Sequence, residues 1–337
     1  GGAREANLLL LADEKGDSSL KELERLPKGA RVVAKGTKFE ELEGQKDALA
    51  TVNVVLVSHV LGVSMSSLLS KLWPLLPNLE WVYARSAGVD HLICPEMIAD
   101  KDRVTFTNAR GVFSHSLAEY TMLAIGYFSK DLARWERNKA AKSWDRFIVK
   151  DIKGSTLGVV GYGDIGRSCA RLAKAYGMNV VAVRRRPEIE DEDGIVDRCF
   201  GPDKVCDLMA ECDYVVCAAP LTPSTKGMIS TKELAAAKKG SVLINVGRGA
   251  VVDEDALVAA LRSGDRLRGA ALDVFTTEPL PDDSPLWTLD NLLLSPHNAD
   301  QTSDFLNKAV AQFVDESVPA FLRGDEPLNR VDVTSGY

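Results

Sequence analysis

The chain has 337 residues, of which 45% are hydrophobic and 26% are charged, and its formal net charge is −7. This length favours two domains, and the composition is typical of a globular protein rather than a disordered one. The acidic balance argues against general nucleic-acid binding, which needs an excess of Lys and Arg to neutralise phosphates. The longest apolar runs have the length of strands, so we expect no membrane span.

The six cysteines form no C-x-x-C pair and show no His and Cys spacing of a metal site. We therefore expect no bound metal, and buried free thiols in a reducing compartment. We expect a cytoplasmic protein. Because the chain does not begin with Met, a transit peptide could have preceded Gly1, and the protein would then belong to an organelle.

Strands and helices alternate along the chain, which is the pattern of an α/β fold with parallel sheets. A helix is predicted at Ser64–Leu76, and a long helix from Ser116, where Ser116 and Glu119 fit a capping box. The first hundred residues also predict five short strands, at Leu8–Leu11, Arg31–Val33, Val52–Val57, Leu79–Tyr83 and Val104–Phe106.

A second sheet is predicted from Thr156 onward, with six strands that make one complete doubly wound sheet. The strands are expected at Thr156–Val160, Asn179–Val183, Tyr214–Ala219, Ser241–Val246, Gly269–Asp273 and Asn291–Ser295. The tail turns helical over Asp304–Leu322 and is too short to fold alone. We expect it to pack on the N-terminal domain, which would make that domain discontinuous.

A glycine-rich turn, Gly161-Tyr-Gly163-Asp164-Ile165-Gly166, lies between a buried strand and a helix. This context favours dinucleotide binding over a merely structural turn. Gly161 permits the tight turn, Gly163 lets the backbone approach a pyrophosphate, and Gly166 lets helix and strand pack closely. The helix N-terminus then presents N–H groups to the phosphates, so we expect Asp164 and Ile165 to lie at the cofactor too.

The end of the second strand of this sheet indicates which dinucleotide binds. Sites for NAD usually carry Asp or Glu there to bind the ribose 2′-hydroxyl. This chain has Arg184, Arg185 and Arg186, with no acid before Glu188. Guanidinium groups can hold a 2′-phosphate, which an acid would repel. We therefore predict NADP(H) in preference to NAD(H); the alternative is a solvated basic turn that accepts NAD equally well.

Three strand ends carry groups suited to reducing a 2-keto acid. That reaction needs a cation for the carboxylate and carbonyl, and a proton donor whose pKa is near neutrality. Arg248, Glu278 and His297 follow three successive strands, at the edge where open α/β sheets bind ligands. A glutamate beside His297 would raise the pKa of the imidazole and fix its tautomer.

In order and spacing, these motifs resemble the signatures of the D-isomer-specific 2-hydroxyacid dehydrogenases. The resemblance rests on residues 161–166, 245–249, 271–279 and 295–297, and it covers essentially the whole chain. The arginine cluster makes the NADPH-linked glyoxylate and hydroxypyruvate reductases the most similar branch of that family.

The resemblance implies a role for each matching position. Arg248 would bind the substrate carboxylate and carbonyl oxygens, His297 would be the acid/base, and Glu278 would orient it. Ser58 and the backbone amides of Ala87 and Gly88 would also contact the substrate. The remaining cofactor contacts would be Ala219, Pro220, Thr225, Val246, Gly247 and Asp273, the last of these near the nicotinamide carboxamide.

The resemblance also implies the organisation of the whole chain. A flavodoxin-like substrate-binding domain of residues 1–107 and 299–337 would be discontinuous, and residues 108–298 would form a Rossmann dinucleotide-binding domain. A cleft between the two would close on hinges near residues 108 and 298. The family further suggests a homodimer built largely through the coenzyme domain.

The sequence departs from the family pattern just after the histidine. Asn298 and Asp300 stand where many members carry apolar or small residues, which could change loop packing or the pocket wall. Among the other histidines, His59 is either a substrate contact or a surface residue. We expect His91 and His115 to be structural.

The favoured activity is reduction of a small 2-keto acid, like glyoxylate or hydroxypyruvate, to a D-2-hydroxy acid with NADPH. A formate dehydrogenase is disfavoured, because those enzymes pair the histidine with glutamine and this chain offers Glu278. A phosphite dehydrogenase is not excluded by the three residues. An NAD(P)-sensing corepressor is the non-enzyme alternative, against which the lack of long disordered stretches weighs.

Overall fold

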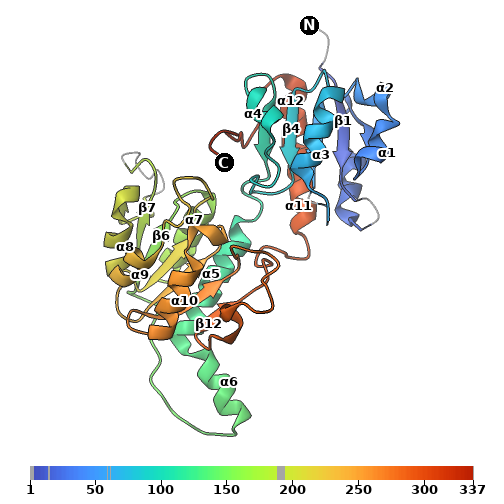
Figure 1. Cartoon of the computed structure of the whole chain (residues 1–337). Helices are drawn as coiled ribbons and strands as arrows, with labels where there is room; N and C mark the ends of the chain where they lie inside the picture. The colour runs from blue at the N-terminus through green and yellow to red at the C-terminus, as the bar shows by residue number, and fades with distance from the viewer. Residues whose placement is uncertain (1–3, 14–15, 59, 61, 188–193, 337) are drawn as a thin grey trace. The chain divides into compact units, whose positions relative to one another are not determined.

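The computed structural model describes residues 4–13, 16–58, 60, 62–187 and 194–336 (Figure 1). The chain divides into two compact units, Gly1–Phe113 with Ser303–Tyr337, and Ser114–Thr302. The domain boundaries expected from the sequence, after residues 107 and 298, lie a few residues from these limits. His59 and the acidic run that begins at Glu188 lie outside the described residues.

The first unit is built on a five-stranded parallel sheet with the order β2-β1-β3-β4-β5. This is the order of flavodoxin-like doubly wound sheets. Every residue of β3 and β4 is buried, so both faces of the sheet need a cover of helices. The strands are β1 (Ala6–Leu11), β2 (Ala30–Lys35), β3 (Val54–Val57), β4 (Trp81–Ala84) and β5 (Thr105–Asn108).

Helical segments cover both faces of this sheet. On one face, Val55 and Val82 share a core with Leu69 and Leu72 of α3. The helix α3 starts where expected, with the Ser64 hydroxyl accepting from the Ser67 N–H, but it ends at Leu72 and continues as a 3₁₀ turn. The segments are η1 (Ser18–Arg25), α1 (Phe39–Glu43), α2 (Lys46–Leu49), α3 (Met65–Leu72), η2 (Trp73–Leu75), α4 (Pro95–Ala99), α11 (Phe305–Gln312), η6 (Phe313–Ser317) and α12 (Val318–Arg323).

The C-terminal segments η6, α11 and α12 cover the other face of the first sheet. The Trp81 ring packs against Phe313 and Phe321, with ring centroids 5.3 and 5.2 Å apart. The Tyr83 hydroxyl donates to the Ala309 carbonyl at 3.1 Å. Figure 1 shows α11 beside the blue strands of the N-terminal half. Burial of these aromatic rings therefore joins the tail to the start of the chain.

The second unit contains a seven-stranded parallel sheet with the order β12-β11-β10-β9-β6-β7-β8. The six expected strands are present, and the sheet has a seventh strand that was not expected. The seventh, β8, is an edge strand of three residues, and so short a segment has no apolar pattern to mark it. The strands are β6 (Thr156–Val160), β7 (Asn179–Val183), β8 (Arg198–Phe200), β9 (Tyr214–Cys217), β10 (Ser241–Asn245), β11 (Leu267–Leu272) and β12 (Leu292–Leu294).

The helix α5 begins at Ser114 rather than Ser116, so the expected capping box is wrong. Ser116 and Glu119 both lie inside the helix, where Glu119 pairs with His115 at 3.0 Å. The helices of this unit are α5 (Ser114–Lys130), α6 (Leu132–Ala140), α7 (Asp164–Ala175), η3 (Pro202–Lys204), α8 (Val205–Glu211), α9 (Thr231–Ala236), η4 (Gly249–Val251), α10 (Glu254–Ser263) and η5 (Pro285–Thr288).

Two helices of the second unit differ in how they are packed. α5 and α7 pack on the same face of the sheet, with Ile125 and Ala173 in one core. By contrast, α6 has no buried residue, and Figure 1 shows it projecting from the sheet. The chain after α6 exposes Trp144 (95%) and Ile148 (98%). Among the helices of the described ranges, none combines the length and apolarity that crossing a bilayer requires.

The attachment of the tail predicts a stability effect. Phe313 is fully buried against Trp81 and Tyr83. Phe313→Ala should therefore destabilise the first unit by about 3–5 kcal/mol, the usual cost of removing a buried phenyl ring. Urea unfolding followed by tryptophan fluorescence measures the change. Leu328→Ala, at a half-exposed residue of the same tail, is the control and should change stability by less than about 0.5 kcal/mol.

Candidate active site

The sheet order of the second unit brings the three candidate catalytic residues to neighbouring strand ends. Arg248 follows β10, Glu278 follows β11 and His297 follows β12, and these three strands are hydrogen-bonded neighbours. Because the strands are parallel, their carboxyl ends lie at one edge of the sheet. That edge is where open α/β sheets bind ligands.

His297 and Glu278 form a close ion pair at this edge. Nδ1 of His297 lies 2.7 Å from Oε2 of Glu278, and Oε1 of Glu278 accepts the Phe275 N–H at 2.8 Å. Both carboxylate oxygens therefore have a donor. Since Nδ1 carries the proton shared with Glu278, Nε2 is the nitrogen that can exchange a proton with another molecule.

The pair shifts both pKa values in the direction of the charged forms. The hydrogen bond that His297 donates to Glu278 raises the pKa of His297, against the lowering effects of burial and of the Arg248 charge. Burial acts to raise the pKa of Glu278, but the bonds from His297 and Phe275 outweigh it and lower that pKa. The imidazole therefore stays protonated to a higher pH than an isolated histidine.

Arg248 sits in a turn that its neighbours fix. The buried Asn245 donates its side-chain amide to the Arg248 carbonyl and accepts the Gly247 N–H, both at 3.1 Å. A Cβ at Gly249 would lie 1.9 Å from the Phe275 carbonyl carbon, so only glycine allows the loops after β10 and β11 to approach this closely. No role for Asn245 was predicted from the sequence, although its place at the end of a strand is a signal.

Asp273 lies at the end of β11 and is 1% exposed. Its Oδ1 accepts the Ser295 hydroxyl at 2.7 Å and the N–H groups of Asn298 and Ala299 at 3.0 and 3.1 Å. Burial raises the pKa of Asp273, and these donors oppose the increase. Asp273 therefore contacts the backbone immediately after His297.

Asp300 is a further acid in the same loop. Burial raises the pKa of its carboxyl, and the charges of His297 and Arg248 act in the opposite direction. In the sequence, Asp300 stands out only as a departure from the family pattern. An acid three residues after a strand-end histidine is the signal by which it could have been found.

The glycine-rich turn joins β6 to α7. Gly161 has φ +94°, and a Cβ there would lie 2.6 Å from the Ala219 nitrogen, so a side chain is excluded. A Cβ at Gly166 would lie 2.3 Å from the Gly161 carbonyl oxygen. By contrast, a Cβ added at Gly163, the N-cap of α7, would have no atom within 4 Å. The loop is thus closed toward the sheet and open at the start of α7, as a bound pyrophosphate requires.

Asp164 and Ile165, between Gly163 and Gly166, have side chains that contact the rest of the protein. Asp164 accepts a hydrogen bond from the Ser114 hydroxyl at the start of α5. Ile165 packs against the core that α5 and α7 share. Their side chains are thus held by α5 and the core, and their backbone forms the first turn of α7.

The basic turn begins beside this loop. The Gly161 N–H donates to the Val183 carbonyl at 3.0 Å, and Arg184 is the next residue. Nε of Arg184 donates to the Arg186 carbonyl at 2.7 Å, and both Arg185 and Arg186 are exposed. Three guanidinium groups therefore follow β7 directly.

A family comparison adds to this geometry. The model of the NAD-binding domain of the D-isomer-specific 2-hydroxyacid dehydrogenases matches residues 122–299. The chain belongs to this family. It is therefore an NAD(P)-dependent oxidoreductase of 2-hydroxy and 2-keto acids, and its two parallel-sheet domains have the fold expected from the sequence.

Individual members of the family are similar over most of their length. A glyoxylate reductase of Korarchaeum cryptofilum is 34% identical over 76% of this chain and 77% of that protein. One of Thermococcus litoralis is 32% identical over 88% and 91%. The crystal structure of a D-isomer-specific 2-hydroxyacid dehydrogenase from Xanthobacter autotrophicus Py2, in complex with NADPH and MES, aligns with a TM-score of 0.80. It is 29% identical and covers 99% of this chain and 100% of that chain.

The other cofactor candidates of this dehydrogenase follow β9 and β10. Ala219 and Pro220 come after β9, where the Thr225 hydroxyl donates to the Pro220 carbonyl at 2.6 Å. Val246 and Gly247 come after β10 and are buried. In the order of the sheet, β9 and β10 lie between β11, which Glu278 follows, and β6, which the glycine-rich turn follows.

The substrate candidates of the first unit lie at the carboxyl ends of β3 and β4. Ser58 is buried, and its hydroxyl has no hydrogen-bond partner within the described part of the chain. The carbonyls of Ala87 and Gly88 accept from the side chains of Asn108 and Ser86 at 2.6 and 2.7 Å. The loop that carries the two expected backbone amides is therefore held by its own side chains.

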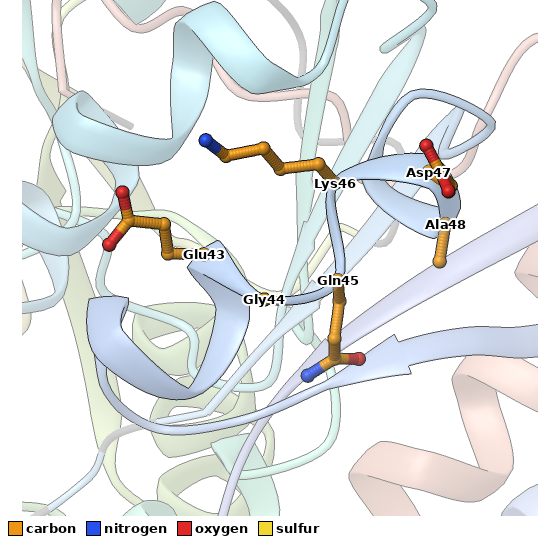
Figure 2. Close-up of a pocket in the computed structure, with 6 residues that line it drawn as sticks. All are labelled: Glu43, Gly44, Gln45, Lys46, Asp47 and Ala48. Atoms are coloured by element: carbon orange, nitrogen blue, oxygen red, sulfur yellow. The ribbon is translucent and has the colours of Figure 1, made fainter.

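The other two described histidines, the cysteines and a surface hollow add no residue to the candidate site. His91 and His115 are exposed, so neither is part of the core. Cys199 and Cys206 are only half buried, unlike the other four cysteines, which corrects the expectation that all six are buried. A shallow hollow at Glu43–Ala48 is lined by six consecutive residues, and Figure 2 shows their side chains pointing in different directions.

The ion pair of His297 predicts a measurable titration. Glu278→Gln replaces the carboxylate whose hydrogen bond chiefly raises the pKa of His297, so that pKa should fall toward its ordinary value. NMR titration of the imidazole measures it, with His297→Gln identifying the resonance. Glu233→Gln, which alters an acid at the start of α9, should leave the titration unchanged. An unaltered His297 pKa in Glu278→Gln would contradict the assigned cause.

Proposed function

We propose that this dehydrogenase reduces a small 2-keto acid, such as glyoxylate or hydroxypyruvate, to the D-2-hydroxy acid, with NADPH preferred over NADH. The observation that carries the proposal is the 2.7 Å pair of His297 and Glu278 beside the charge of Arg248. A carboxylate, a protonated imidazole and a guanidinium at one sheet edge meet the demands of carbonyl reduction.

Each side chain has a distinct task in this reaction. Arg248 binds the substrate carboxylate and polarises the carbonyl, because a planar guanidinium can donate two parallel hydrogen bonds to these oxygens. His297 donates its Nε2 proton to the carbonyl oxygen as the carbonyl carbon is reduced. Glu278 holds the ring through Nδ1 and stabilises the imidazolium. In the first unit, Ser58, Ala87 and Gly88 are the candidate substrate contacts, supported by a buried hydroxyl without a partner in the described residues.

The residues of the second unit fit a dinucleotide phosphate. The open space at Gly163 and the start of α7 suit the pyrophosphate, and Arg184, Arg185 and Arg186 suit a 2′-phosphate. Ala219, Pro220, Thr225, Val246 and Gly247 are the further candidates along the sheet edge, with Asp273 for the carboxamide. NADPH, when bound, supplies the hydride that the carbonyl carbon accepts.

We also propose that the chain forms a homodimer through the second unit. Two observations support this. No residue of α6 is buried, and Trp144 and Ile148, in the chain after α6, are almost fully exposed. Large apolar side chains that extend into solvent are typical of a protein interface. A second copy of this chain is the proposed partner.

The chemistry is tested by following NADPH oxidation with glyoxylate, hydroxypyruvate, pyruvate and phenylpyruvate. His297→Gln should lower kcat about 10²- to 10⁴-fold, the usual contribution of a general acid, while NADPH binding stays intact. His115→Gln, which changes an exposed histidine of the same unit, is the matched control and should retain full activity. Fluorescence titration of NADPH measures binding in all three proteins.

Two results would contradict this proposal in different ways. Strong residual turnover in His297→Gln would remove the histidine as the proton donor. Lack of turnover by the unaltered protein with every keto acid would argue against the reductase and favour a nucleotide-binding protein without this activity.

The cofactor preference predicts a second outcome. Arg184→Ala and Arg185→Ala should each lower kcat/KM for NADPH by about 10- to 100-fold, the equivalent of one hydrogen bond to a charged group. The value for NADH should hardly change, because NADH lacks the 2′-phosphate. Arg262→Ala, in the last turn of α10, serves as the control. Equal kcat/KM for the two cofactors in the unaltered protein would refute the preference.

A further inference from the structure

His297 has a backbone conformation that is rare for a residue with a side chain. Its φ is +51°, in the left-handed region that favours glycine. Such a conformation persists only where the surrounding structure over-determines it, and it sets the direction of the imidazole. The contacts that hold the turn of residues 295–302 therefore control where the imidazole points.

Asp273 holds the turn from the side of the sheet. Its Oδ1 accepts the N–H groups of Asn298 and Ala299, and Oδ2 has a single longer contact with the Ala299 N–H at 3.3 Å. One oxygen therefore fixes the backbone that follows His297, while the other is left nearly unused by the protein. This division requires the carboxylate to keep one orientation.

Two hydroxyl groups fix that orientation. The Ser295 hydroxyl lies 2.7 Å from Oδ1 of Asp273 and 2.9 Å from the Tyr120 hydroxyl. A hydroxyl has one proton, and a carboxylate oxygen can only accept, so Ser295 donates to Asp273 and Tyr120 donates to Ser295. Tyr120 comes from α5, is 9% exposed, and keeps its proton because burial raises its pKa to about 12.

Gln301 holds the turn from the solvent side. Its side-chain amide donates to the His297 carbonyl at 2.8 Å, and its N–H donates to the Asn298 carbonyl at 3.0 Å. The His297 N–H donates to the Ser295 carbonyl at 3.0 Å. Both backbone polar groups of His297 are thus bonded within the turn.

We propose that Tyr120, Ser295 and Gln301 are positioning residues, which with Asp273 hold the turn of residues 295–302 in the conformation that aims His297 at Glu278. The inference rests on the proposed role of His297 as proton donor. None of the three needs to contact the substrate. Their effect passes through the backbone of His297.

The charged groups around His297 determine what loosening the turn does to its titration. Glu278 is in direct contact, and Arg248, Asp273 and Asp300 act on the ring through their charges. Of these, the hydrogen bond to Glu278 has the largest effect and raises the pKa of His297. A ring that leaves Glu278 loses this stabilisation, so its pKa falls. In the reduction direction, where the imidazole must be protonated, the alkaline limit of activity then moves to lower pH.

The test uses the full chain with Ser295→Ala, Tyr120→Phe and Gln301→Ala. Ser295→Ala should lower kcat about 10- to 100-fold, because a misplacement of about 1 Å at the reacting group can cost about 100-fold. KM for NADPH should change less than kcat, since the Gly161–Gly166 loop is untouched and the Asp273 side chain is retained. The alkaline limb of kcat/KM should move to lower pH in all three variants. Ser295→Thr, which keeps the hydroxyl, should restore kcat and the pH profile.

Matched controls separate positioning from general loss of stability. Ser129→Ala removes a buried hydroxyl from α5, the helix of Tyr120, and Tyr214→Phe removes a buried tyrosine hydroxyl bonded to Arg268. Both controls should keep the kcat and the pH profile of the unaltered protein. If Ser295→Ala behaves like Ser129→Ala, or if its kcat falls with an unmoved alkaline limb, the proposal is wrong.

NMR titration of His297 gives a readout that does not depend on turnover. The pKa of His297 should be lower in Ser295→Ala and Tyr120→Phe than in the unaltered protein, and unchanged in both controls. If the protein reduces no keto acid but the variants show this shift, the proposed function is wrong and the positioning role of the three residues still holds. Identical His297 titrations in all variants would overturn the positioning role, whatever the activity.

Discussion

The hydrogen-bonded ion pair of Glu278 and His297 is the contact on which the rest of the site depends. A 2.7 Å contact between two loops tolerates little displacement of either. The Phe275 N–H holds the glutamate, while Asp273 and the turn after β12 hold the histidine. Because β11 and β12 are parallel neighbours, both loops leave the sheet at the same edge, and the fold supplies the proximity that the pair needs.

The charged groups at this edge act in opposite directions on the pKa of His297. Glu278 raises the pKa of His297, and Arg248 lowers it. Asp273 and Asp300 add two further carboxyl groups to this edge, and burial raises the pKa of each. Groups of both signs therefore surround the imidazole, and the bond to Glu278 decides the direction in which its pKa moves.

The sequence was sufficient for features that depend on local pattern, and insufficient for those that depend on packing. Buried strands, the glycine-rich turn and the strand-end positions of Arg248, Glu278 and His297 are visible because each is encoded within a few residues. The three-residue strand β8 is held by pairing with β7, and no pattern within its own residues predicts that pairing. Likewise, Tyr120 meets Ser295 across 175 positions, so its hydroxyl reads as part of an apolar helix face until the tertiary structure is known.

The order of the strands separates cofactor recognition from acid–base chemistry. The basic turn follows β7, near one edge of the sheet, whereas the ion pair follows β11 and β12 at the opposite edge. β9 and β10 lie between them with β6, and charges this far apart in solvent are largely screened. We therefore expect that the guanidinium groups proposed to hold a 2′-phosphate can be exchanged without shifting the pKa of His297. This physical independence allows one reaction to be paired with either nicotinamide cofactor on the same sheet.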